Sequence, residues 1–220
     1  MKPLVCIFAH PDDEAFGPGG TIAKEARRRP VYIICATEGE AGKHKGKKTQ
    51  TDLGKIRAME LQRSTKILGV KKVFSLGFKD GALSNNLYHK LATKIEKILT
   101  KIKPDTILTY EPHGISGHID HIIIAMVSNF VFRRLPFIKT LMQYCVLDSK
   151  SRREIAKNYF IYVPPAYKKS QIDLVVNTRA VWDTKVKAMM QHQSQIHDIE
   201  RILKMSAHLP KKENFLVVSR

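Results

Sequence analysis

Long apolar runs, paired cysteines and a dinucleotide-binding glycine motif are all missing from this sequence of 220 residues. The apolar runs, such as residues 122–127, fall far short of the ~18 residues that a transmembrane helix needs, so we expect no membrane span. The glycines at residues 17–20 do not form Gly-x-Gly-x-x-Gly, which argues against dinucleotide binding. Cys6, Cys35 and Cys145 lie in apolar runs without a Cys-x-x-Cys pair. With no signal-peptide pattern at the start, we expect buried free thiols in a cytoplasmic protein.

Acidic residues are scarce relative to basic ones, with 20 Asp and Glu against 38 Lys and Arg, a formal net charge of +18. Such a balance favours anionic partners such as nucleic acid, an anionic membrane surface or a phosphorylated substrate. The positive charge is scattered, however, and only residues 43–48 form a cluster. No aromatic side chains interleave with that cluster as a base-stacking surface requires. We therefore interpret most of the charge as solvated surface and expect no nucleic-acid partner.

Strand and helix patterns alternate along the chain. Short apolar runs predict strands, and apolar residues at helical spacing predict the helices between them. The expected strands are residues 4–9, 31–37, 72–76, 106–110 and 141–147, with helices at 20–28, 51–68, 87–102 and 119–133. Residues 215–218 are predicted as an edge strand. This alternation predicts an α/β fold in which helices cover both faces of a mostly parallel sheet, in one domain over residues 1–220.

Two acidic and imidazole-rich stretches follow predicted strands. Ala-His-Pro-Asp-Asp-Glu spans residues 9–14 after the first strand, and Gly-His-Ile-Asp-His spans residues 117–121 after the fourth. In parallel α/β folds, sites lie beyond the carboxyl ends of the strands. We therefore expect the two stretches to meet around one divalent cation that serves hydrolytic chemistry.

The spacing suggests which of these residues bind the metal. His10 and Asp13 lie in one loop, and His121 completes a His/Asp/His set, the three protein ligands typical of catalytic zinc. Imidazole and carboxylate ligands also suit Fe²⁺ and Mn²⁺. Asp12, beside a ligand, is the candidate general base, and His118 is the candidate for steadying the oxyanion or protonating the leaving amine. Another acid, Asp120, is predicted to accept a hydrogen bond from an imidazole ring and to orient it.

Both stretches together resemble the N-acetylglucosaminyl-phosphatidylinositol de-N-acetylase family, also called PIG-L or LmbE-like. Further likeness lies in Thr-Glu-Gly-Glu-Ala-Gly at residues 37–42 and in the Arg-x-x-Glu pair formed by Arg57 and Glu60. The segments Gly-Phe-Lys-Asp-Gly at residues 77–81 and His-Gln-Ser-Gln at residues 192–195 resemble the family as well. The similarity covers most of the chain.

This resemblance implies a Rossmann-like three-layer fold and a zinc-dependent deacetylase acting on N-acetylglucosamine conjugates. It implies the same three ligands, with Asp12 as base and His118 facing the oxyanion or leaving amine. It also implies that Arg57 and Asp80 contact the polar groups of the substrate. Some bacterial relatives carry a Tyr two residues before the first His of the second motif, where this sequence has Ser116.

Two other interpretations stay open at this point. The same metal chemistry would serve an amidase acting on a non-sugar acyl group, because the reaction does not depend on what lies beyond the amide. Alternatively, the chain is a basic domain that binds an anionic ligand and keeps a metal for structure. An amino-sugar conjugate, with the positive charge suiting an anionic one, is the expected partner. The sequence says nothing about the oligomeric state.

Overall fold

The computed structural model describes residues 1–42, 49–157 and 162–220, so the basic cluster at residues 43–48 lies outside the described residues. The strands are β1 Leu4–Phe8, β2 Val31–Thr37, β3 Lys72–Phe78, β4 Thr106–Tyr110, β5 Thr140–Cys145, β6 Leu174–Asn177 and β7 Lys212–Ser219. The α-helices are α1 Asp13–Phe16, α2 Gly19–Ala26, α3 Gln50–Leu68, α4 Tyr88–Ile102, α5 Gly114–Gly117, α6 Ile119–Arg134, α7 Lys150–Lys157, α8 Trp182–Met189 and α9 Ile196–Ser206.

All seven strands form one sheet in the order β3-β2-β1-β4-β5-β7-β6. The first five are parallel, and β7 runs antiparallel to both β5 and β6. The predicted mostly parallel α/β fold is therefore confirmed. The prediction of an edge strand at residues 215–218 is wrong, because β7 lies inside the sheet and β6 forms the edge. Local sequence pattern does not encode which distant strands pair with each other, so it cannot predict the position of β7 in the sheet.

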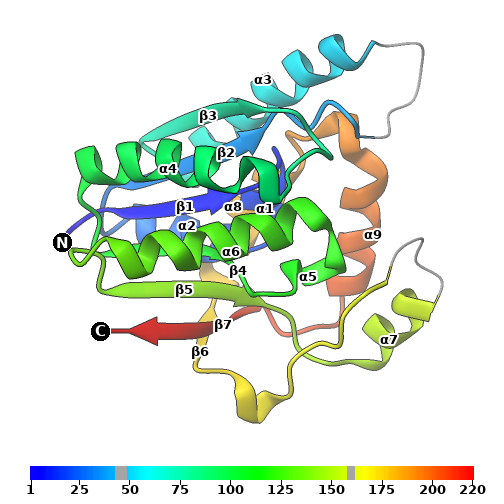
Figure 1. Ribbon diagram of the computed structural model, residues 1–220. Coiled ribbons are helices and arrows are strands. Elements are labelled where there is room, and N and C mark those ends of the chain that lie inside the picture. Colours follow the sequence, from blue (N-terminus) through cyan, green and yellow to red (C-terminus); the bar gives the residue numbers. More distant parts are fainter. Residues whose placement is uncertain (43–48, 158–161) are drawn as a thin grey trace.

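Strand β1 is the middle strand of the parallel part of the sheet. Its five residues are wholly buried, and it pairs in parallel with β2 on one side and β4 on the other. Helices α4 and α6 lie in front of the sheet in Figure 1, and α2 and α8 lie behind it. The three cysteines are buried and unpaired, as the sequence predicted. Among the described residues, no helix has the length and apolar composition needed to cross a membrane.

Two helices begin at polar N-cap residues near the carboxyl edge of the sheet. Thr49 caps α3 by accepting a hydrogen bond from the backbone N–H of Asp52 at 3.1 Å. His118 caps α6, its Nδ1 accepting from the backbone N–H of Asp120 at 3.2 Å. The cap on α6 fixes the His118 side chain beside the first turn of the helix, which also carries His121.

Candidate active site

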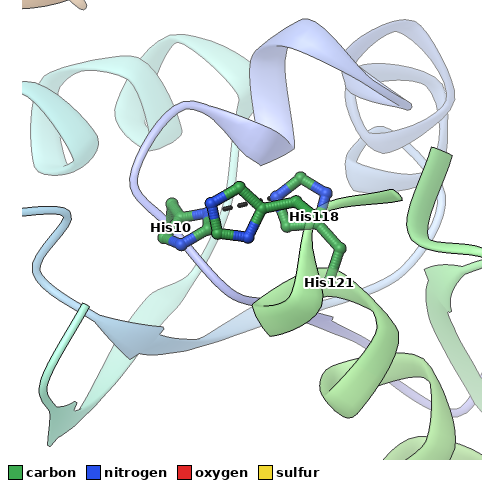
Figure 2. A group of neighbouring side chains, drawn as sticks. All are labelled: His10, His118 and His121. Atoms are coloured by element: carbon green, nitrogen blue, oxygen red, sulfur yellow. Dashed lines mark hydrogen bonds between the residues drawn. The ribbon is translucent and has the colours of Figure 1, made fainter. Parts of the chain in front are cut away.

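The site lies where three loops leave the carboxyl ends of β1, β3 and β4. The first loop carries His10, Asp12 and Asp13, the second carries Asp80, and the third leads into α6. Figure 2 shows the imidazole rings of His10, His118 and His121 gathered in one place, although the first comes from a segment more than a hundred residues before the others. The expected meeting of the two sequence motifs is thus observed.

Potential ligand atoms of three residues converge. His10 Nδ1 lies 3.0 Å from His121 Nε2 and 3.7 Å from Asp13 Oδ2, and His121 Nε2 lies 3.4 Å from Asp13 Oδ1. Ligands at ~2.0–2.2 Å from a tetrahedral zinc ion stand roughly 3.3–3.6 Å apart, and the observed separations bracket this range, which suits a shared cation. The backbone N–H of His10 donates to Asp13 Oδ2 at 2.7 Å and holds the carboxylate in place. This donor set fits a divalent metal.

His10 is oriented from its other edge by two carboxylates. Its Nε2 lies 2.9 Å from Asp80 Oδ1 and 3.3 Å from Asp120 Oδ2. Potential ligand atoms of these three residues also lie within 4.8 Å of one another. Because both carboxylates face the nitrogen that points away from His121, they hold the ring proton at Nε2 and leave Nδ1 toward Asp13 and His121. That is the usual arrangement around a metal-binding histidine.

His121 is oriented in the same manner by its own loop. Its Nδ1 lies 3.0 Å from the carbonyl oxygen of Gly114, which only accepts, so Nδ1 carries the proton and Nε2 offers a lone pair. A Cβ atom on Gly114 would stand 2.7 Å from the Cβ of His121, so only glycine permits this approach. The ring of Tyr110 stacks on His121 with centroids 4.3 Å apart. Tyr110 is buried beneath the site, and Ser116 is half-buried.

A buried carboxylate shapes the loop that holds Gly114. Glu111 accepts hydrogen bonds from the backbone N–H groups of His113 at 2.7 Å and Ile115 at 2.6 Å, and from the Tyr167 hydroxyl at 2.9 Å. Ile115 has φ 66° and ψ −57°, a conformation that β-branched residues rarely adopt. The loop is therefore locally strained, and Glu111 holds it in place.

His118 lies beside the ligand atoms, but its Nδ1 accepts a hydrogen bond, whereas the Nδ1 of His121 donates one. Its ring centroid is 4.8 Å from that of His10 and 5.0 Å from that of His121. Since Nδ1 accepts the helix N–H of Asp120, the neutral ring carries its proton on Nε2. Burial, followed by the nearby His10, lowers the pKa of His118, so the neutral form is favoured. His118 thus offers an N–H donor at a half-buried position.

Asp12 lies next to Asp13 and is held by Arg57. Arg57 donates through Nη2 to Asp12 Oδ2 at 2.7 Å and to the carbonyl oxygen of Pro11 at 2.6 Å, and through Nη1 to that of Gly39 at 2.6 Å. Burial raises the pKa of Asp12 to about 7, against the lowering effect of the Arg57 guanidinium. A carboxylate that titrates near neutral pH is suited to accept a proton from water.

The protonation of the site's imidazoles shows what a cation would replace. Burial disfavours the charged form of His10, yet hydrogen bonds to Asp120 and Asp80 outweigh it and raise the pKa to about 10. Burial lowers the pKa of His121 to about 4. A proton on His10 Nδ1 therefore points at the lone pair of His121 Nε2, in a cluster surrounded by carboxylates. A divalent cation that displaces this proton would meet the same negative charge.

The two residues expected to contact substrate are engaged within the protein. Arg57 is 4% exposed and donates to Asp12 and to the carbonyl oxygens of Pro11 and Gly39. Asp80 is 8% exposed, with Oδ2 accepting from the backbone N–H of Ala41 at 3.0 Å. Their role in substrate binding stays a prediction. Sequence reasoning assigned no role to Glu14 or His192, although the first lies in the Asp-Asp-Glu motif and the second in the late His-Gln-Ser-Gln segment.

Comparison with known proteins shows to which family the chain belongs. The family profile of GlcNAc-PI de-N-acetylases matches residues 5–131, more than half of the sequence. The chain belongs to this de-N-acetylase family. It is 30% identical, over 88% of its length and 84% of the relative, to the probable N-acetyl-alpha-D-glucosaminyl L-malate deacetylase 2 of Bacillus cereus. It is 32% identical to the diacetylchitobiose deacetylase of Thermococcus kodakarensis, over 89% of this chain and 70% of that one.

Solved structures support the fold of this de-N-acetylase family member. The N,N'-diacetylchitobiose deacetylase of Pyrococcus horikoshii superposes with a TM-score of 0.73 at 24% identity, covering 99% of this chain and 84% of that one. A 4-carboxy-2-hydroxymuconate hydratase from Pseudomonas putida superposes with a TM-score of 0.74 at 16% identity, covering 100% and 97%. Because a hydratase shares the fold, the architecture alone does not specify the reaction. The family match and the site together identify the chain as an amide hydrolase of the deacetylase class.

Proposed function

We propose that this chain removes the acetyl group from N-acetylglucosamine conjugates in a metal-dependent reaction, with zinc as the metal. The observation that carries the proposal is the convergence of His10 Nδ1, Asp13 and His121 Nε2 at separations of 3.0–3.7 Å beside a carboxylate suited to act as base. A zinc ion, when bound, polarises the acetamide carbonyl and acidifies water. The deacetylase relatives from Bacillus and Thermococcus support the amino-sugar substrate class.

The residues of the chain supply the proton transfers. Asp12 takes a proton from the attacking water as its oxygen bonds to the acyl carbon. The Nε2–H of His118 donates to the negative charge that develops on the carbonyl oxygen. When the bond between the acyl carbon and the nitrogen breaks, the proton held by Asp12 passes to the leaving nitrogen. The products are acetate and a free amine.

Three residues would hold the His10 ring and the Asp12 carboxylate in position for the reaction. Asp80 and Asp120 fix the His10 ring from its Nε2 edge. Arg57 holds the Asp12 carboxylate and the carbonyl oxygen of the preceding Pro11, which favours an orienting role for this arginine. A substrate contact at Arg57 or Asp80 would have to share these bonds.

A substrate panel tests the proposal. N-acetylglucosaminyl malate, diacetylchitobiose and N-acetylglucosaminyl inositol are incubated with zinc-loaded enzyme, chelated enzyme and Asp12→Asn, and free amine and acetate are measured. We expect full release from the zinc-loaded wild type and from the matched exposed variant Asp183→Asn, and little or none from the chelated enzyme and Asp12→Asn. Absence of metal-dependent amine release from every conjugate would contradict the proposal. Release of a larger acid from a non-sugar amide would favour the amidase, and salt-sensitive anion binding unchanged by Asp12→Asn would favour the binding domain.

A further inference from the structure

Behind the site lies a buried pair of ionisable side chains that the proposed reaction does not use. His192 is fully buried and Glu14 is 1% exposed, and His192 Nε2 lies 2.7 Å from Glu14 Oε1. The Ser64 hydroxyl donates to the same oxygen at 2.5 Å. Replacing a buried ion pair by apolar side chains is often neutral or stabilising, so stability alone does not account for this one.

The other oxygen of Glu14 reaches the candidate base. Glu14 Oε2 accepts a hydrogen bond from the backbone N–H of Asp12 at 3.0 Å. Asp12 has φ 109°, a backbone conformation that costs free energy for any residue other than glycine. Such a conformation persists only when surrounding contacts impose it. The carboxylate of Glu14 is one of these contacts, and its own position depends on His192 and Ser64.

One face of α3 joins these groups. Arg57, Glu60 and Ser64 are spaced by three and four residues, which places them on the same side of the helix. Glu60 accepts from the backbone N–H of Ser194 at 2.8 Å and from its hydroxyl at 2.6 Å. The helix therefore holds Asp12 through Arg57 and fixes the segment that carries His192 through Glu60.

Within the described part of the chain, Glu14 is the hydrogen-bond partner of the His192 ring. Among the described residues, its Nδ1 has no hydrogen-bond partner, so the contact with Glu14 is the hydrogen bond that its ring makes. His192 thus serves as a fixed donor to Glu14.

We infer that His192 and Glu14 are positioning residues for Asp12, and that the chain from His192 through Glu14 to the Asp12 backbone keeps the base in its strained, productive conformation. This inference rests on the proposed function. Neither residue contacts the reacting atoms. Their contribution is geometric, because a misplacement of about 1 Å in a catalytic group can lower the rate by roughly a hundredfold.

Two substitutions at His192 separate positioning from packing. His192→Gln keeps an N–H donor in reach of Glu14, whereas His192→Met fills the space without one. We expect His192→Met to lower kcat by roughly 10- to 100-fold, with KM and zinc content unchanged, and His192→Gln to stay within about threefold of wild type. In a crystal structure of His192→Met, we expect the hydrogen bond from the Asp12 N–H to Glu14 to be lost and the φ of Asp12 to leave the positive range.

The Asp12→Asn background shows whether His192 acts through the base. If it does, His192→Met costs nothing further there, because residues that act as a unit are not additive. An equal fractional loss in both backgrounds would overturn the inference. So would a wild-type kcat for His192→Met in an enzyme whose wild type is active, whereas an inactive wild type overturns the proposed function itself.

Ser64→Ala covers the case in which His192→Met fails to fold. It removes the second donor to the same Glu14 oxygen, and we expect a several-fold lower kcat with unchanged KM. Ser128→Ala is the matched control, since Ser128 is fully buried in α6 and its hydroxyl has no partner among the described residues. A kcat for Ser64→Ala equal to that of Ser128→Ala would overturn the inference.

Discussion

Replacing Asp120 by Asn is the sharpest test of the metal site, because the change keeps the shape and removes one acceptor. Asp120 is 1% exposed. Its Oδ2 accepts from the backbone N–H of Gly81 at 2.8 Å and faces His10 Nε2 at 3.3 Å, and its Oδ1 accepts from that of Leu83 at 3.2 Å. An asparagine has one acceptor oxygen for these two positions.

The least costly rotamer places the amide nitrogen toward Leu83, so the backbone N–H of Leu83 loses its acceptor and the buried amide N–H groups face another donor. A buried N–H group without an acceptor costs about 1–3 kcal/mol of unfolding free energy. For a chain of this length we expect the melting temperature to fall by roughly 2–4 °C for each kcal/mol. Removing the charge that orients His10 weakens metal binding as well, by about 10- to 100-fold when a partner of a ligating histidine is lost.

Competition with a fluorescent chelator measures the zinc affinity. Thermal melts with and without chelator measure the change in melting temperature. Asp183→Asn is the control, since it makes the same chemical change at an exposed position of α8. Wild-type zinc affinity together with a wild-type melting temperature in Asp120→Asn would refute the role of Asp120 in orienting His10.

Three further predictions follow from the described contacts. Asp12→Asn lowers kcat by about 10²–10⁴-fold at unchanged zinc content, and full turnover in the variant excludes Asp12 as the base. The pKa of His10 is raised from 6.5 to about 10, so its contribution to the stability of metal-free protein is complete below pH 6.5 and is lost as the pH rises through 10. Zinc affinity, measured by titration, should rise over that window, and a flat profile argues against His10 as a ligand. Glu213→Gln breaks a buried pair with Lys185 at 2.7 Å and costs about 3–5 kcal/mol in urea unfolding, and a loss under 1 kcal/mol shows that the pair is dispensable.

Much of the fold could be predicted from the local sequence pattern. The apolar runs and helical spacings predicted five parallel strands with helices between them, because burial on both faces leaves a continuous apolar signature. The sheet position of β7 was not accessible, since it depends on pairing with β5 and β6 across long stretches of chain.

The sequence by itself determined that imidazoles and carboxylates would meet at the carboxyl ends of β1 and β4, because parallel strands bring such loops to one edge. Only the tertiary structure decided which nitrogen of each ring is free, because that depends on acceptors such as the Gly114 carbonyl and the Asp80 carboxylate. It also decided that Arg57 turns inward to Asp12 and that His192 meets Glu14 from 178 residues away. Local pattern records burial and turns, whereas these partnerships arise only when distant segments pack together.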